Sequence, residues 1–309
     1  VDALGELAGT GAGVDLMNFV RARYLRDELK MGGTVERDLS LLQELRDRFG
    51  PLDWRLADAH ALHWAYLATR RADVGEFDDN YFRIVLESLY QMMRAGRLHL
   101  NETTGNLVSA FITYPNTAFY DELKEYHLEV IGQETDEHRL ENWKEDLRGL
   151  YEEGVIMLFL DGQVEKARRE MAEAHERWPW HEGFAMDSVQ EYVYTNYLEH
   201  TIMVDYQRAQ AAISQIIRMQ LEALALGNER RAAGMERLAR LAIDRYMQEY
   251  SHHPIPPYDE LLRTSVNQYV YGPQGVRMAP FFRERLMDRL GLPERRPEET
   301  PGEPAGEQG

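Results

Sequence analysis

Apolar residues recur at helical spacing almost throughout the chain. Stripes at positions i, i+3, i+4 and i+7 begin at Phe82, Trp143, Val164 and Tyr206, a spacing that gathers them on one face of an α-helix. Strand-like alternation has one candidate, Leu107–Tyr114. The pattern therefore predicts an all-α protein, with helices filling more than half of the chain between residues 14 and 290.

Glycine and proline separate these stripes at short intervals, which predicts antiparallel helical hairpins. The region 96–117 is looser, and we expect a long loop there, dividing the helical domain 15–290 into two halves, with a helix restarting after Asn116 or Thr117. Residues 1–14 are rich in glycine and predict a flexible lead or linker. Residues 291–309 combine proline and glutamate with few apolar side chains, which predicts a disordered acidic tail.

The stretch Tyr151–Pro179 resembles a tetratricopeptide (TPR) helical hairpin. Tyr151 matches the first aromatic position of that motif, Gly162 its turn, Ala167 and Ala174 its small positions, and Pro179 its end. Gly154, Val155 and Leu158 depart from the pattern, and a fainter echo runs from Gly227 through Ala232 to Ala239. The resemblance implies a degenerate TPR-like α-solenoid, which would cover about residues 35–250. The segments 49–55 and 59–65 are also similar to uncharacterised bacterial proteins with such repeats, a similarity that implies no function.

Composition excludes several classes of function. A chain of 309 residues with 44% hydrophobic residues can build its own core, and the absence of cysteine excludes thiolate zinc sites, iron–sulfur clusters and cysteine nucleophiles. The net charge of −18 would repel phosphate backbones, so we expect no nucleic-acid partner. Only four of the 35 basic residues are lysines, and we expect many of the arginines to pair with carboxylates on helix surfaces.

The longest apolar run, Gly154–Leu160, is far shorter than the roughly 20 residues that a membrane helix needs. We therefore expect no membrane span in this chain. The sequence begins at Val1 with a glycine-rich stretch typical of a linker, which leaves open an upstream signal peptide or membrane anchor. Localisation stays open between a cytoplasmic and an exported or membrane-tethered protein.

The sequence contains no complete motif for catalysis or for binding a metal or cofactor. His60 and His63 lie three apart on one predicted helix, as the first two ligands of a metal site would, but no third histidine follows at helical spacing. In the alternative interpretation, His60 and Trp64 pack with Leu67 against a neighbouring helix, and one of these two side chains donates to a buried carbonyl. Glu249 and His252 give the di-iron spacing only once, whereas that site needs it twice. We expect no metal, no cofactor and no catalytic residue.

Four residues are candidates for contact with a partner: Arg55, Trp180, Tyr194 and Tyr197. Tryptophan and arginine are the side chains that most often dominate binding energy at interfaces, and tyrosines combine apolar area with a hydroxyl group. The alternatives are that Arg55 pairs with a carboxylate beside a buried Trp54, and that the tyrosines belong to the core. Trp178 completes a core stripe, which leaves Trp180 free to be exposed.

Two functions from different classes follow. The first is a non-enzymatic scaffold that binds a protein or peptide on the surface of its helical repeats. The second is an enzyme built as an α/α toroid, in which aromatic residues stack sugars and Asp or Glu residues act as acid and base. No pair of carboxylates stands out in the sequence, and the region 96–117 interrupts the regular helices that a toroid needs, so the first function is favoured.

Overall fold

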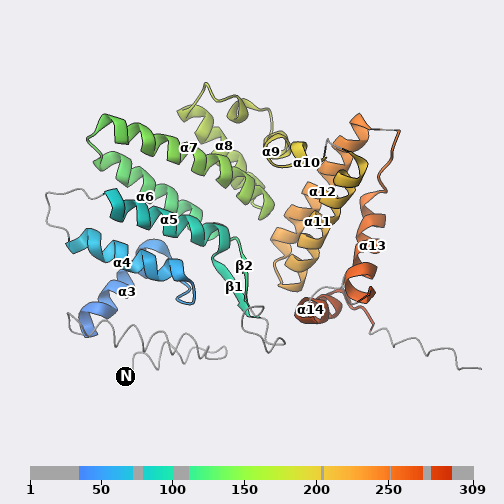
Figure 1. The fold of residues 1–309 in the computed structure, drawn as a ribbon, viewed down its shortest axis with the longest axis horizontal. Coiled ribbons are helices and arrows are strands. Elements are labelled where there is room, and N and C mark those ends of the chain that lie inside the picture. The colour runs from blue at the N-terminus through green and yellow to red at the C-terminus, as the bar shows by residue number, and fades with distance from the viewer. Residues whose placement is uncertain are drawn as a thin grey trace, which may run out of the picture. The chain divides into compact units, whose positions relative to one another are not determined.

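The computed structural model describes residues 35–71, 79–100, 111–202, 205–250, 252–273 and 280–293. Helices hold 80% of the described residues, which confirms the prediction of a mainly helical protein (Figure 1). The expected flexible lead, 1–14, and the tail from residue 294 onward lie outside the described residues. Within the described ranges, no helix combines the length and the apolar character that crossing a membrane requires.

The chain divides into two compact units, residues 1–154 and 155–309, and the division falls within helix α7. The region 96–117, where the sequence suggests a boundary, lies inside the first unit. The elements of that unit are α3 (Val35–Phe49), α4 (Ala57–Arg71), α5 (Asp79–Ala95), β1 (Arg97–Leu100), β2 (Phe111–Tyr114), the 3-10 turn η2 (Thr117–Phe119), α6 (Tyr120–Gln133) and the larger part of α7 (Glu137–Leu160).

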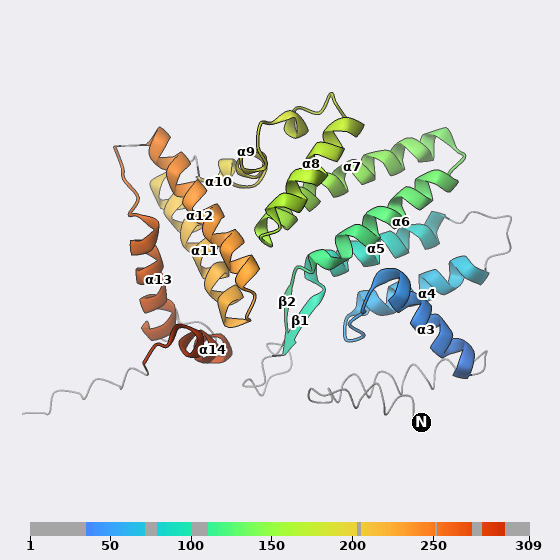
Figure 2. The same cartoon turned by 180° about the vertical axis from the view of Figure 1, so that it is seen from behind.

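Within this first unit, successive helices pack side by side. Helices α4 and α5 are in extensive contact, α5 also packs on α6, and Figures 1 and 2 show this order from opposite sides. Fully buried Leu62, Leu89 and Tyr151 contribute to the core. A Cβ at Gly154 would lie 2.1 Å from Cε2 of Tyr120, so the glycine lets α6 approach α7 closely.

The expectation of a long loop at 96–117 is wrong for the described part of that region. Strand β1 pairs antiparallel with β2, with Arg97 opposite Tyr114 and Leu100 opposite Phe111. The strand candidate Leu107–Tyr114 is confirmed at its last four residues, whose aromatic and β-branched side chains favour extended backbone. No strand is predicted from the sequence at residues 97–100, which form one by pairing with β2. The helical chain resumes at η2 and α6, although the Asn116 side chain caps neither.

The second unit contains the end of α7 and a further series of helices. These are α8 (Val164–Arg177), the 3-10 turn η3 (Glu182–Ala185), α9 (Val189–Val193), the π-helix η4 (Tyr194–Leu198), α10 (Glu199–Ile202), α11 (Tyr206–Ala225), α12 (Glu229–Glu249), α13 (Tyr258–Tyr271) and α14 (Pro280–Leu290). Helix α11 lies at the centre of the last four and contacts α12, α13 and α14. Helices α11 and α12 form an antiparallel hairpin (Figure 2).

Two hairpin turns of this unit have the same local structure. Gly162 and Gly227 adopt φ of 76° and 77°, a region that glycine enters at no steric penalty. In each turn the next residue donates its backbone N–H to a carbonyl five positions earlier, Gln163 to Leu158 at 2.8 Å and Asn228 to Ala223 at 2.9 Å. These bonds define a Schellman motif that ends the first helix of each hairpin.

Small residues follow these two turns at equal offsets and are buried in both hairpins. They are Ala167 and Ala174 after Gly162, and Ala232 and Ala239 after Gly227. The expected helix breaks at Gly162 and Gly227 are thus confirmed. The large apolar position between them holds buried Met171 in the first hairpin and half-buried Glu236 in the second.

The two hairpins touch through their backbones. A Cβ at Gly234 of α12 would lie 2.4 Å from the carbonyl oxygen of Leu160 and 2.9 Å from the backbone nitrogen of Gly162. The buried carboxylate of Asp161 accepts from Arg230 at 3.3 Å at the same place. The turn between α7 and α8 therefore rests directly on the beginning of α12.

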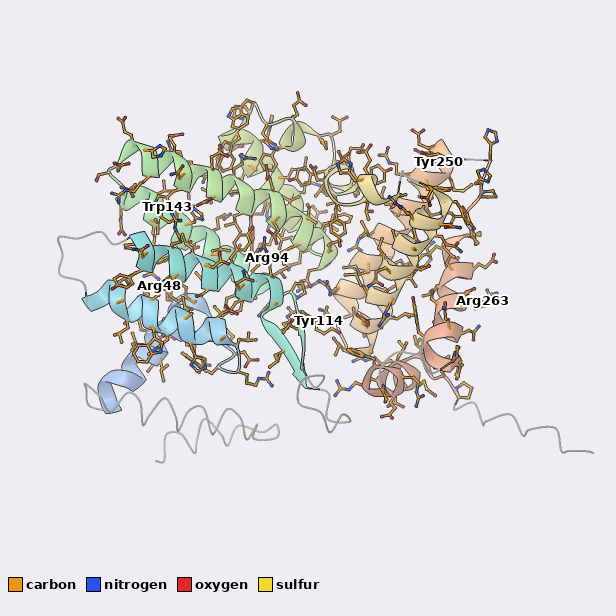
Figure 3. The ribbon with its side chains drawn as sticks, viewed as in Figure 1. Arg48, Arg94, Tyr114, Trp143, Tyr250 and Arg263 are labelled. Carbon is orange, nitrogen blue, oxygen red and sulfur yellow. The ribbon has the colours of Figure 1, made fainter. Side chains whose placement is uncertain are left out.

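Arginine–carboxylate pairs cover the helix surfaces, as the composition predicts. Arg148 pairs with Glu145 and Glu152 along α7. Between helices, Nε of Arg94 on α5 (Figure 3) donates to Glu153 at 2.6 Å, and the Tyr90 hydroxyl donates to the same carboxylate at 2.6 Å. Exposed pairs of this kind contribute about 0–1 kcal/mol each, so the apolar core supplies most of the stability.

Candidate functional site

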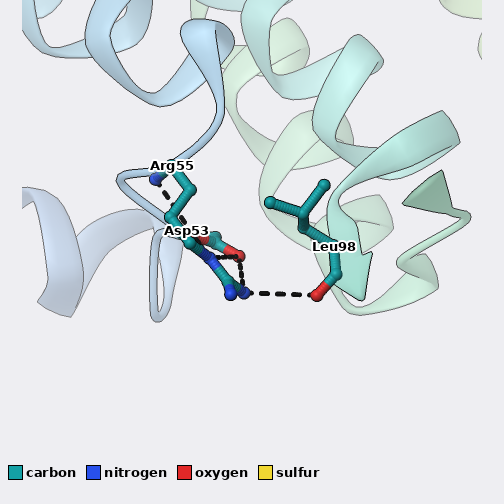
Figure 4. A network of polar contacts seen from close by, with 3 residues as sticks. All are labelled: Asp53, Arg55 and Leu98. Atoms are coloured by element: carbon teal, nitrogen blue, oxygen red, sulfur yellow. Dashed lines mark hydrogen bonds and ion pairs between the residues drawn. The ribbon is translucent and has the colours of Figure 1, made fainter. Parts of the chain in front are cut away.

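The turn before α4 contains the first candidate, Arg55, and its guanidinium is engaged within the protein (Figure 4). It donates to both carboxylate oxygens of Asp53, at 2.8 and 2.6 Å, and to the carbonyl oxygen of Leu98 at 3.2 Å. The side chains of Arg55 and Asp53 are only 20% and 19% exposed. Arg55 is therefore removed from the candidate contact residues, because its donors tie the turn to strand β1.

The two candidate metal-ligand histidines follow this turn and serve the packing around it. His60 donates from Nε2 to the carbonyl oxygen of Trp54 at 2.8 Å, as the alternative interpretation expects. His63 is fully buried, with the rings of Trp54 and Trp64 at 6.0 and 4.9 Å. Trp64 itself is 46% exposed and does not lie in the core.

Neither ring nitrogen of His63 has a hydrogen-bond partner among the described residues. Burial, with a smaller effect of neighbouring His60, lowers the pKa of His63 to about 4, so the ring is neutral near pH 7. Within the described ranges, no three His, Asp or Glu residues come together in a way that could hold a metal ion. The His60–His63 pair thus has an identified role in packing.

The most exposed aromatic side chain of the described residues is Trp180, in what we call the Trp180 turn, residues 178–186. After α8 ends, the N–H of His181 donates to the carbonyl of Trp178 at 3.0 Å, and the N–H of Phe184 donates to the carbonyl of His181 at 3.1 Å. These bonds fix the backbone around Pro179 and Trp180. The Trp180 side chain is 65% exposed.

A chain of aromatic ring contacts connects Trp180 to the buried rings of Phe184 and Tyr192. The Trp180 ring meets the His181 ring edge-on at 5.9 Å, and the His181 ring lies 4.5 Å from that of Phe184. Phe184 stacks on Tyr192 of α9 at 5.7 Å and also lies 6.3 Å from Trp178. Phe184 and Tyr192 are only 2% and 1% exposed. An exposed tryptophan therefore stands on a firmly packed aromatic stack.

The tyrosine candidates separate in the structure. Tyr194 is 4% exposed, its hydroxyl has no hydrogen-bond partner among the described residues, and the Arg245 guanidinium lies 5.3 Å from its ring. Burial, followed by the nearby Glu199 carboxylate, raises the pKa of Tyr194. Tyr194 is therefore removed from the set of surface residues. Tyr197 is 44% exposed.

The π-helix explains why Tyr194 and Tyr197 differ in exposure although their i, i+3 spacing predicts a shared helix face. Residues i and i+3 share a face of a regular α-helix, whereas the wider i→i+5 turn of η4 changes the angle between them. Asn196 donates its side-chain N–H to the carbonyl of Tyr192 at 2.9 Å within this irregular stretch. No sequence signal marks the π-turn in advance.

Two of the four predicted contact residues, Trp180 and Tyr197, are thus on the surface, and both belong to the second unit. The structure adds exposed apolar side chains that sequence reasoning missed: Trp64, Ile84 and Tyr250. Exposure of a single apolar side chain is common. Trp180 has the largest exposed fraction of these side chains, and it stands in a hydrogen-bonded turn whose aromatic support includes buried Phe184 and Tyr192. No protein-family model, curated protein or solved structure matches this chain.

Proposed function

We propose that the protein is a non-enzymatic interaction scaffold, a TPR-like array of helical hairpins that binds a protein segment through the Trp180 turn. The observation that carries the proposal is the 65% exposed Trp180 side chain on its buried aromatic stack. A tryptophan held in this way offers a large contact area while losing little conformational freedom on binding. Side chains of this kind often dominate the binding energy of an interface.

The arrangement of the hairpins supports the solenoid part of the proposal. The turns at Gly162 and Gly227 share one backbone motif and the same offsets to buried alanines, which is the behaviour of a repeated unit. The close approach of Gly234 on α12 to the backbone of Leu160 and Gly162 is a contact between the two hairpin turns. In a stack of hairpins the alanine faces would be taken up by packing within each hairpin, which would leave turns such as 178–186 for a partner. No observation favours the toroid enzyme.

Selection from a displayed library of random peptides tests the proposed function. The immobilised parent protein should enrich peptides that a Trp180→Ala variant binds at least about 30-fold more weakly, which corresponds to about 2 kcal/mol. Ile84→Ala is the matched control, since it removes another exposed apolar side chain, 42% exposed in the first unit. Its binding should equal that of the parent.

Either of two results would contradict the proposal: no enriched peptide depends on Trp180, or Trp180→Ala unfolds the protein. Circular dichroism and chemical denaturation of each variant identify the second result. Replacement of Tyr197 by Ala extends the test, because a loss of affinity would place this tyrosine on the same binding face.

A further inference from the structure

The surface around the Trp180 turn carries uncompensated negative charge. Glu176 in the last turn of α8, Glu182 in η3 and Asp187 just after it are all exposed. In the part of the chain that the structure describes, the side chains of these three residues form no ion pair and no hydrogen bond. Three carboxylates thus lie within seven positions of Trp180 along the chain.

Arg177 is the one lysine or arginine between residues 176 and 187, and it is already paired. Arg177 pairs with Glu173 at 2.9 Å, and Arg245 of α12 pairs with Glu191 of α9. These pairs neutralise Glu173 and Glu191 and leave the other three carboxylates without a counter-charge. The apolar part of the same surface consists of exposed Pro179, Trp180 and Ala185.

We propose that the segment bound by the Trp180 turn is a basic peptide, in which an Arg or Lys side chain stacks on the exposed Trp180 ring while neighbouring basic side chains meet Glu176, Glu182 and Asp187. This inference rests on the proposed function and specifies its partner. A cation over a tryptophan face is attracted by the ring quadrupole, and tryptophan is the best ring for that contact. Complementary charge across the interface adds specificity and speeds association.

The charges disfavour other occupants of this surface. An acidic or phosphorylated segment would bring like charges together at the three carboxylates. A second copy of the same chain would do so too, because the protein carries a net charge of −18. A purely apolar segment would leave the carboxylates partly desolvated without a partner, which is unfavourable.

Two probes test the inference: the library selection, and a synthetic ten-residue peptide of alternating Arg and Leu, with an alternating Glu and Leu peptide as its control. Peptides that depend on Trp180 should be rich in Arg and Lys. The Arg peptide should bind the parent at least ten times more tightly than the Glu peptide, with an affinity that falls as salt is added.

Variants separate local from overall charge. The triple variant E176Q/E182Q/D187N should weaken binding of the Arg peptide at least tenfold, as should Trp180→Ala, which leaves the net charge unchanged. The matched control E260Q/E284Q/D288N removes three exposed carboxylates from α13 and α14 and should change the affinity less than twofold. Equal losses in the two triple variants would overturn the inference, because overall charge alone would then explain binding.

The outcomes also distinguish this inference from the proposed function. Enriched peptides that require Trp180 but lack basic residues would overturn the inference and support the scaffold. Absence of any Trp180-dependent peptide would overturn both. Circular dichroism of every variant establishes that lost binding is not lost folding.

Discussion

Two turns of this protein look alike in sequence and differ in the structure. Each combines proline and tryptophan with a basic residue directly after the tryptophan, Pro51, Trp54 and Arg55 in one and Pro179, Trp180 and His181 in the other. In the first turn Arg55 meets Asp53 and the carbonyl of Leu98, and the side chain is drawn inward. In the second the Trp180 ring remains 65% exposed.

The difference teaches that a partner within reach decides whether an anchor residue faces inward or outward. A guanidinium can be partly buried when a carboxylate and a carbonyl satisfy its donors. At the second turn the aromatic stack of His181, Phe184 and Tyr192 is complete without Trp180, whose ring touches only its edge. One turn thus connects parts of the fold, whereas the other keeps its tryptophan side chain on the surface.

The largest expected effect is acid sensitivity of the packing between His63 of α4 and Trp54 of the first turn. The pKa of His63 is about 4 in the folded protein and 6.5 in the unfolded chain, so the neutral ring contributes its full stabilisation above pH 6.5. That contribution is lost as the pH falls from 6.5 towards 4, by up to about 3 kcal/mol. Urea denaturation at pH 7 and at pH 4.5 measures the difference.

A His63→Leu variant is the control, because it removes the titrating ring and should flatten this pH dependence. Some dependence should persist, since burial also lowers the pKa of His127 to about 4. An unchanged pH profile in His63→Leu would show that the first turn does not carry the acid sensitivity.

Replacement of Arg55 by Ala should lower the free energy of unfolding by about 2 kcal/mol, because it leaves Asp53 partly buried without its counter-charge. The matched control is Arg168→Ala. Arg168 and Glu165 form a pair with exposures of 59% and 73%, so their separation should change stability by less than about 0.5 kcal/mol. Equal losses of stability in the two variants would show that the Arg55–Asp53 pair contributes no more than the exposed Arg168–Glu165 pair.

A smaller effect should come from the support of the second turn. A Cβ at Gly183 would lie 3.0 Å from Cε1 of His181 and 3.2 Å from Cε2 of Tyr192. Gly183→Ala should therefore disturb the aromatic stack and lower stability by about 1 kcal/mol. Gly132→Ala in α6, where the space is open, should instead raise stability by up to about 1 kcal/mol. Thermal denaturation of both variants compares them, and a stabilised Gly183→Ala would contradict the packing of the stack.

The smallest expected effect is that of Trp180→Ala on stability, within about 0.5 kcal/mol of the parent, because an exposed ring contributes little to the core. Chemical denaturation measures this value directly. A loss of unfolding free energy above about 1.5 kcal/mol would mean that Trp180 stabilises the fold as Arg55 does, and the two turns would then not differ in this respect.

Local features of the hairpins could be predicted from the sequence. The turns at Gly162 and Gly227 require positive φ, which glycine allows without strain, and the alanines that follow can be recognised by helical spacing. The exposure of Trp180 was likewise predictable, since the apolar stripe of residues 164–178 ends at Trp178, the C-cap residue of α8. In these cases the deciding interactions lie within about one helical turn or along one helix face.

The candidate site was only partly predictable, because several deciding contacts join residues far apart in sequence. Arg55 meets a carbonyl 43 residues away, and Arg245 meets Glu191 across 54 residues beside the buried Tyr194. Spacing could suggest that Arg55 and Tyr194 are polar anchors, but only packing shows that both lie inward.

The sequence by itself determined the helical class, the positions of two hairpin turns and the acidic surface, because periodicity, glycine geometry and charge act locally. Only the tertiary structure decided that residues 97–100 form a strand, that Gly234 receives the turn at Leu160, and that η4 turns Tyr197 outward while Tyr194 is buried. The strand and the contact at Gly234 each depend on a neighbour supplied by another part of the chain, and the chain's own local preferences do not specify that neighbour.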